Sequence, residues 1–200
     1  MTSRVTVLYE DCLTPHSTGT QFGPHLLLVE CILDDLRAEG HDPPDRFTVA
    51  RHHVLANPKN GHANVKREFL QNGALLTRDG SSLVAVYDLD KVDRLIDDVA
   101  IKSRRCKREM RECLRGGPEA PAAGWVYFLN ANTETLLDAA RRILGRPSAG
   151  KPRPAERDSI LQALIAQGPE ARAALRERVP SFDYIVRKVA ELARPLLTGG

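Results

Sequence analysis

The chain lacks the features of a disulfide-rich or membrane-spanning protein. Its 200 residues contain four cysteines with no C-x-x-C pair and no dense framework, namely Cys12, Cys31, Cys106 and Cys113. That pattern favours reduced thiols in a cytoplasm over disulfides or a zinc site. No stretch approaches the roughly 18 consecutive apolar residues of a membrane span, and no apolar signal segment follows Met1. We therefore expect a soluble, cytoplasmic protein without membrane contact.

A strong charge imbalance and a P-loop are also missing. The net charge of +3 and the pI near 8.7 permit nucleic-acid binding without requiring it. The sequence Gly-Lys-Ser/Thr does not occur, so we do not expect this chain to bind ATP itself. A hydrophobic content of 42% and a charged content of 28% are ordinary for a globular protein. The length suits one domain with a sizeable core, or one domain with a small appendage.

Apolar strand-like segments alternate with helical patterns over residues 5–144. The expected strands are residues 5–9, 47–55, 83–87 and 125–129, and the expected helices are residues 25–39, 64–76 and 134–144, the last with Asn132 or Thr133 as its cap. This alternation predicts an α/β fold with a mostly parallel sheet flanked by helices, of Rossmann-type topology. A proline-rich stretch at residues 146–154 leads into three short helical patterns. We predict an α/β domain over residues 1–145 and a helical C-terminal extension over residues 146–200 that packs on it.

Acidic residues follow three of the predicted strands. Glu10 and Asp11 follow the first, Asp88 and Asp90 follow the third, and Glu134 comes shortly after the fourth. Ligand sites in open α/β sheets lie at the carboxyl ends of the strands. On an extended backbone, side chains two positions apart point the same way, so Asp88 and Asp90 are expected to face one spot. A hard divalent cation relieves the repulsion between such carboxylates. The alternative is that these residues are helix caps and solvated strand ends.

A strand followed by glutamate, and a later strand followed by Asp-x-Asp, resembles the TOPRIM domain. That domain occurs in topoisomerases, bacterial primases and nucleases of the overcoming-lysogenization-defect type, and the resemblance covers roughly residues 4–144. It implies that Asp88 and Asp90 match the metal-binding Asp-x-Asp and that Glu10 matches the acid/base or metal-ligating glutamate. Asp11 and Glu134 are further candidate metal ligands. Asp11 stands where the family usually has glycine.

The resemblance also implies an activity and partners. It implies phosphodiester hydrolysis with Mg²⁺ or Mn²⁺, and a separate ABC-type ATPase subunit in a phage-defence assembly. A run of basic residues after Asp-x-Asp is expected to contact nucleic-acid phosphates: Lys102, Arg104, Arg105, Lys107, Arg108 and Arg111. A solvated helix face is the alternative for this run. We therefore predict a metal-dependent TOPRIM-like nuclease. A non-catalytic TOPRIM-like subunit that binds a protein or nucleic acid, and a small-molecule phosphoesterase, stay open as alternatives.

Overall fold

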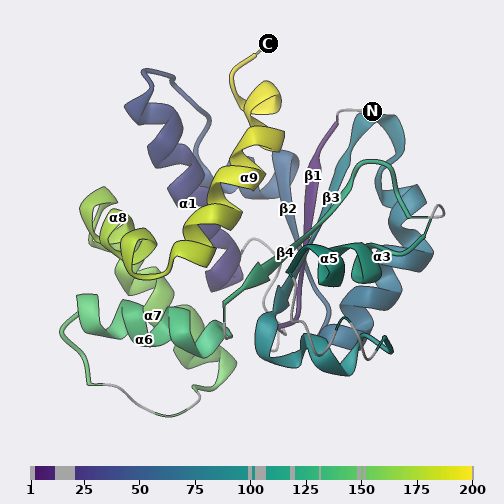
Figure 1. Cartoon of the computed structure of the whole chain (residues 1–200). Coiled ribbons are helices and arrows are strands. Elements are labelled where there is room, and N and C mark those ends of the chain that lie inside the picture. The colour runs from purple at the N-terminus through teal and green to yellow at the C-terminus, as the bar shows by residue number, and fades with distance from the viewer. Residues whose placement is uncertain are drawn as a thin grey trace.

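The protein folds around a parallel β-sheet that helices cover on both faces (Figure 1). The computed structural model describes residues 3–11, 21–98, 101, 107–117, 120–130, 132–147, 150 and 152–199. Its strands are β1 (Val5–Tyr9), β2 (Val54–Pro58), β3 (Ser82–Asp88) and β4 (Gly124–Leu129). Its longer helices are α1 (Gly23–Ala38), α3 (His62–Leu76), α5 (Lys107–Arg115), α6 (Thr133–Ile143), α7 (Pro154–Ala166), α8 (Pro169–Arg178) and α9 (Pro180–Leu197). All strand pairs are parallel, in the order β2-β1-β3-β4, which confirms the predicted α/β class.

Both faces of the sheet are buried, because side chains alternate between the faces along each strand. On one face, Val7 and Val84 belong to a buried cluster with α1. On the other face, Leu8 and Ala85 belong to a cluster with α3 and α5. Figure 1 shows α1 on one side of the sheet and α3 and α5 on the other. The central strand β3 has no face in water, which explains the uninterrupted apolar run of residues 83–87.

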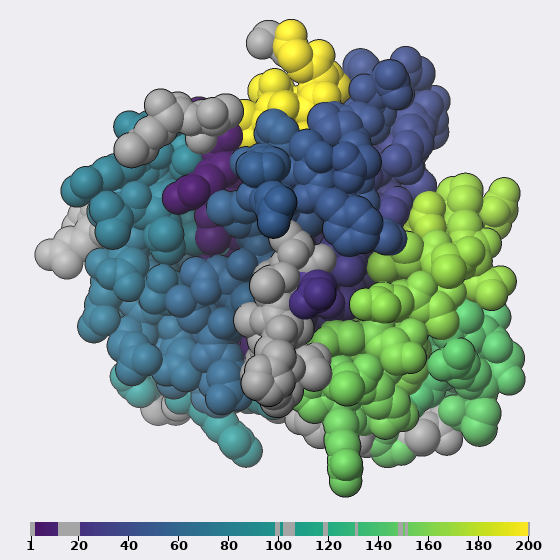
Figure 2. Space-filling view, turned by 180° about the vertical axis from the view of Figure 1, so that it is seen from behind, coloured from purple at the N-terminus to yellow at the C-terminus, as the bar shows by residue number. Residues whose placement is uncertain are grey.

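The three C-terminal helices share a core with α1. Leu161 of α7, Leu175 of α8 and Val186 of α9 belong to the same buried cluster as the apolar face of α1. A paired arginine adds a polar contact, because Arg172 Nε and Nη2 donate to the carboxylate of Asp34 at 2.6 and 2.8 Å. Figure 2 shows α7 and α8 on the side of the molecule opposite to α3. The C-terminal helices thus lie on the α1 face of the sheet.

The prediction of a strand over residues 47–55 is wrong for most of that segment. A short helix α2 (Arg46–Thr48) and a π-helical turn η2 (Val49–His53) precede β2. Asp45 caps this helix, since its Oδ1 accepts hydrogen bonds from two backbone amides of α2 at 2.9 and 3.2 Å. The cap starts a helix even though the β-branched residues of the segment favour a strand. The strand continues instead through Asn57-Pro58, where proline is tolerated because β2 is an edge strand.

The segments after β3 and β4 position the site described below. After β3 the chain forms the 3₁₀-helix η4 (Leu89–Arg94), and α5 follows later. After β4, the cap predicted for α6 is confirmed, because Asn132 Oδ1 accepts a hydrogen bond from Thr135 N at 3.2 Å. Among the helices of the described ranges, none combines the length and the apolar character that a membrane crossing requires.

Candidate functional site

The connections of the sheet create a crevice between β1 and β3. The chain leaves β1 towards β2 on one side and leaves β3 towards β4 on the other, so its winding direction reverses between the central strands. In open α/β sheets, ligands bind outside the carboxyl ends of the strands at such a switch point. Glu10 and Asp11 follow β1 directly, and Asp88 is the last residue of β3. The fold therefore brings three carboxyl groups to this crevice.

A turn after β2 fixes the backbone of Glu10 and Asp11. Gly61 N donates to the carbonyl of Glu10 at 2.6 Å, and Asn60 N donates to that of Asp11 at 3.2 Å. Gly61 has a φ of +111°, in the left-handed region that glycine adopts without a Cβ clash. The two acidic residues are thus held in register with the end of β2, although they lie beyond the end of β1.

The carboxyl groups of Glu10 and Asp88 are buried next to each other. Asp88 N donates a hydrogen bond to Glu10 Oε1 at 2.8 Å, and Asp88 is only 6% exposed. Burial, followed by the charge of Asp88, raises the pKa of Glu10 to about 8. Burial, followed by the charge of Asp11, raises the pKa of Asp88 to about 6. The crevice therefore gathers carboxylates where water solvates their charge poorly.

Two polar side chains contact these carboxylates from neighbouring elements. Thr133, the first residue of α6, has its hydroxyl oxygen 3.1 Å from Asp11 Oδ2 and 3.4 Å from Asp88 Oδ1. Lys91 of η4 has its Nζ 3.4 Å from Asp88 Oδ2. The threonine links the ends of β1 and β3, and the lysine balances part of their negative charge.

Asp90 does not continue the strand that ends at Asp88, contrary to the expected arrangement. The strand ends at Asp88 and Asp90 lies in η4, so the extended backbone predicted across the pair is wrong. The turn of η4 brings Val92 into the buried cluster under α3 and α5, which accounts for the early end of the strand. Asp90 is exposed, and its Oδ2 accepts a hydrogen bond from Asn132 Nδ2 at 3.1 Å. It does not line the pocket between β1 and β3.

The crevice opens into a pocket with a volume of about 250 Å³, just below the usual range of small-ligand sites. Charged side chains of both signs line this acidic pocket: Glu10, Asp11, Asp88, Lys91, Glu134 and Arg157. Arg157 belongs to α7, and its Nη1 lies 3.4 Å from Asp11 Oδ1. No local pattern in the sequence indicates Arg157, because a residue of a C-terminal helix carries no local sign of contact with the end of β1. Glu134, in the first turn of α6, is brought to the same pocket as predicted.

The predicted basic run does not reach this pocket in the part that the structure describes. Lys107 and Arg108 of α5 are exposed, and neither lines the acidic pocket. The guanidinium carbon of Arg111 lies 6.0 Å from the ring centre of Tyr127 and 5.6 Å from that of Tyr184. Arg111 therefore contacts aromatic rings of β4 and α9. The other members of the run, Lys102, Arg104 and Arg105, lie outside the described residues.

The carboxylates of the pocket are held by hydrogen bonds and ion pairs in this conformation. Across the described ranges, no three His, Cys, Asp or Glu side chains are arranged to hold a metal ion as they stand. Comparisons with protein-family models, curated proteins and solved structures found no match for this chain.

Proposed function

We propose that the acidic pocket binds a divalent cation and that the protein is a metal-dependent, TOPRIM-like phosphodiester hydrolase acting on nucleic acid. The observation that carries the proposal is the contact between Glu10 and Asp88, which come from adjacent central strands. Keeping both carboxylates ionised in a buried place costs free energy, and a bound cation offsets that cost. The switch-point location and the acidic residues after both strands support the TOPRIM-like assignment.

The oxygen donors of the pocket suit a hard cation. Carboxylate oxygens of Glu10, Asp11 and Asp88 and the hydroxyl of Thr133 lie together at the end of the sheet. Such donors favour Mg²⁺ or Mn²⁺ over softer metals. A cation bound there polarises a phosphate oxygen and lowers the pKa of a bound water. Glu134 lines the same pocket and is a further candidate ligand of the cation. Asp90 does not line the pocket, but it stays a candidate ligand through the TOPRIM resemblance.

The remaining charged residues suit the binding of a phosphate group. Arg157 and Lys91 line the pocket from α7 and η4, and both are donors for phosphate oxygens. Glu10 lines the same pocket, beside these groups, and is placed to exchange a proton with a bound water or leaving group. We expect Glu10 to act as the acid/base residue and Arg157 to bind the phosphate. An ATPase partner in a phage-defence assembly extends the proposal through the TOPRIM resemblance.

A non-catalytic subunit is the second candidate, and one contact favours it. Lys91 Nζ lies 3.4 Å from Asp88 Oδ2 and supplies an internal positive charge. The pocket could then keep its shape without a cation, and the chain would bind a protein or nucleic-acid partner without cleaving it. This candidate predicts no stabilisation by Mn²⁺ and no hydrolysis.

A cleavage assay separates the two candidates. The full chain is incubated with labelled DNA, RNA and a small phosphodiester, in Mg²⁺ or Mn²⁺ and in EDTA. We expect metal-dependent cleavage of nucleic acid, and a loss of about 10²–10⁴-fold in Glu10→Gln, the range for a general acid or base. Asp88→Asn should also be inactive. Asp42→Asn, which removes an exposed carboxylate outside the pocket, should be as active as the native protein.

A stability measurement completes the test. A cation that binds only the folded state stabilises it by about 2.7 kcal/mol at a concentration of 100 times its Kd. Mn²⁺ should therefore raise the melting temperature of the native protein and of Asp42→Asn, but not of Asp88→Asn. If no metal shifts the melting temperature and no substrate is cut, the hydrolase proposal is rejected in favour of the non-catalytic subunit.

A further inference from the structure

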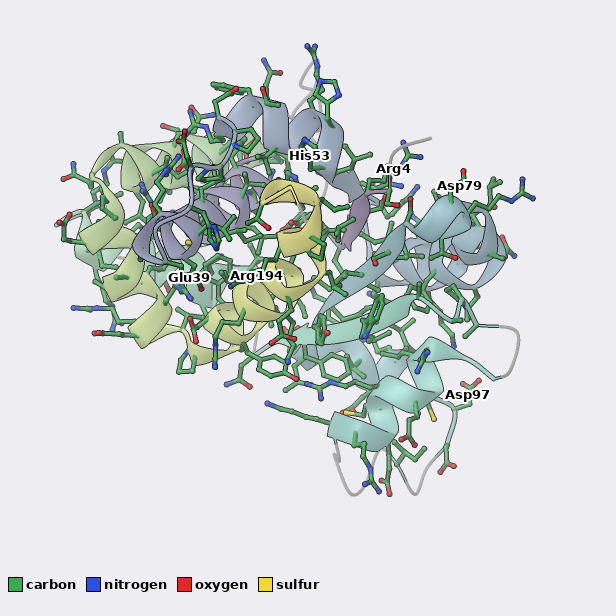
Figure 3. All side chains as sticks on the ribbon, turned by 90° about the horizontal axis from the view of Figure 1, so that it is seen from above. Arg4, Glu39, His53, Asp79, Asp97 and Arg194 are labelled. Atoms are coloured by element: carbon green, nitrogen blue, oxygen red, sulfur yellow. The ribbon has the colours of Figure 1, made fainter. Side chains whose placement is uncertain are left out.

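The amino-terminal edge of the sheet gathers basic residues from three strands. Parallel strands begin at the same edge, and Val5 pairs with Val54 on one side and with Ser82 on the other. Arg4, His53 and Ser81 immediately precede these three strand starts, so they lie at the same edge of the sheet. A hydrogen bond from Arg4 N to Ser81 Oγ at 3.2 Å fixes this arrangement. Figure 3 shows Arg4, His53 and Asp79 along this edge of the molecule.

These residues line a groove at the opposite end of the sheet from the acidic pocket. The groove has a volume of about 980 Å³, and its walls combine basic and apolar side chains, among them Arg4, Arg51, Arg78, Leu55, Leu75 and Leu76. We call it the basic groove. Its apolar part includes Leu75, which is 56% exposed. Because β1 spans five residues, the basic groove and the acidic pocket lie about 17 Å or more apart.

The three arginines of the basic groove have no acidic partner in the described part of the chain. Arg4, Arg51 and Arg78 are all exposed, and Asp79 is the one carboxylate among the residues that line the groove. With neutral histidines, three positive charges face one negative charge. Such a concave surface of one sign attracts a ligand of the opposite sign.

Several arginines elsewhere in the described part of the protein are paired with carboxylates. Arg176 donates to both Asp35 and Asp183, and Arg194 pairs with Glu39, as the neighbouring labels in Figure 3 indicate. The groove arginines have no such partner among the described residues and are gathered on one concave surface, so their charges are available to a ligand.

We propose that the basic groove binds the phosphate backbone of a nucleic-acid strand. Guanidinium groups bind phosphates through two parallel hydrogen bonds, and several of them along a groove follow a chain of phosphates. The leucine side chains offer apolar contact to sugars or bases between those phosphates. A lipid bilayer is too flat to enter a recessed groove. The site is separate from the acidic pocket and does not depend on hydrolysis there.

The test measures oligonucleotide binding to the full chain in EDTA, by fluorescence anisotropy over a series of salt concentrations. The variant Arg4→Ala/Arg51→Ala/Arg78→Ala removes the three groove arginines. Its salt dependence should fall by about 2 in the slope of log K against log salt, because each single-strand phosphate contact contributes about 0.7. At low salt its Kd for single-stranded DNA or RNA should rise by roughly 10-fold or more. Asp79→Asn should tighten binding, since it removes the opposing charge.

A matched control removes three exposed arginines on the other half of the molecule. Arg142, Arg146 and Arg178 are exposed and do not line the basic groove. Replacing all three by alanine changes the net charge equally and should leave the Kd within about twofold of the native value, since no phosphate contact is removed. Circular dichroism and a melting curve show whether each variant is folded. If both triple variants weakened oligonucleotide binding equally, the net charge alone would explain the change in Kd, and the proposal would be overturned.

Other outcomes separate this inference from the proposed function. Asp42→Asn, which removes an exposed carboxylate that lines neither the acidic pocket nor the basic groove, should bind oligonucleotides as well as the native protein. If cleavage is never observed but the groove variant loses binding, the hydrolase proposal fails and the basic groove stands. Unchanged binding in a folded groove variant overturns the groove whatever the cleavage assay shows. Tighter binding of polyglutamate or of anionic vesicles than of oligonucleotides overturns the assignment to nucleic acid.

Discussion

Replacing Glu10 by glutamine should stabilise the metal-free protein at alkaline pH. Burial beside Asp88 raises the pKa of Glu10 from 4.5 to about 8. Between these values the folded state holds a proton that the unfolded state releases, so the free energy of unfolding falls as the pH rises through this window. Below pH 4.5 both states are protonated, and the contribution is fully present. Glutamine cannot ionise, so the variant avoids the loss.

The size of the effect follows from the two pKa values. Their difference corresponds to about 5 kcal/mol as an upper limit, at 1.36 kcal/mol for each pKa unit. Part of this free-energy difference comes from repulsion by the carboxylate of Asp88, whose own pKa is raised to about 6. Glutamine keeps an oxygen that can accept the hydrogen bond from Asp88 N. We therefore expect the advantage of Glu10→Gln to grow by about 2–4 kcal/mol between about pH 5 and pH 8.5.

Urea unfolding in EDTA at both pH values measures this difference. Glu177→Gln, which changes an exposed glutamate of α8, is the matched control and should follow the native protein at both pH values. Adding Mn²⁺ should stabilise the native protein and leave Glu10→Gln less affected, because the proposed cation offsets the cost of ionising Glu10. A constant difference between native protein and variant at both pH values would refute the account of a buried, repelled carboxylate.

Three further predictions concern the frame around the pocket. Gly61→Ala should lower the free energy of unfolding by about 1 kcal/mol, because alanine is strained at a φ of +111°. The variant should also bind Mn²⁺ more weakly. An unchanged midpoint of urea unfolding would contradict the predicted loss of stability. Arg176→Ala removes the partner that Asp35 and Asp183 share, and because both carboxylates are partly exposed it should lower the free energy of unfolding by about 1–3 kcal/mol. Denaturant unfolding measures this loss, and an unchanged midpoint would contradict it. Burial raises the pKa of Cys31 to about 12, so its thiol should react with a thiol reagent only after unfolding, and rapid labelling of the folded protein would show otherwise.

Local patterns in the sequence predicted the sheet and its acidic ends. The apolar run of residues 83–87, the capping side chain of Asn132 and the acidic residues after the strands are features of short segments. The alternation of strands and helices then implies parallel strands whose carboxyl ends meet at one edge. The same local reasoning failed at residues 47–55, where the cap of Asp45 outweighed the strand propensity of the β-branched residues that follow it.

The sequence by itself determined β1, β3 and β4 and which of them end in carboxylates, because burial and capping act within a few residues. Only the tertiary structure decided which of these groups meet. The strand order β2-β1-β3-β4 makes Glu10 and Asp88 neighbours, and the packing of α7 brings Arg157 to Asp11. The strand order likewise places Arg4 beside the residues that precede β2 and β3. Contacts between distant segments depend on how the elements pack, and no short stretch of sequence encodes them.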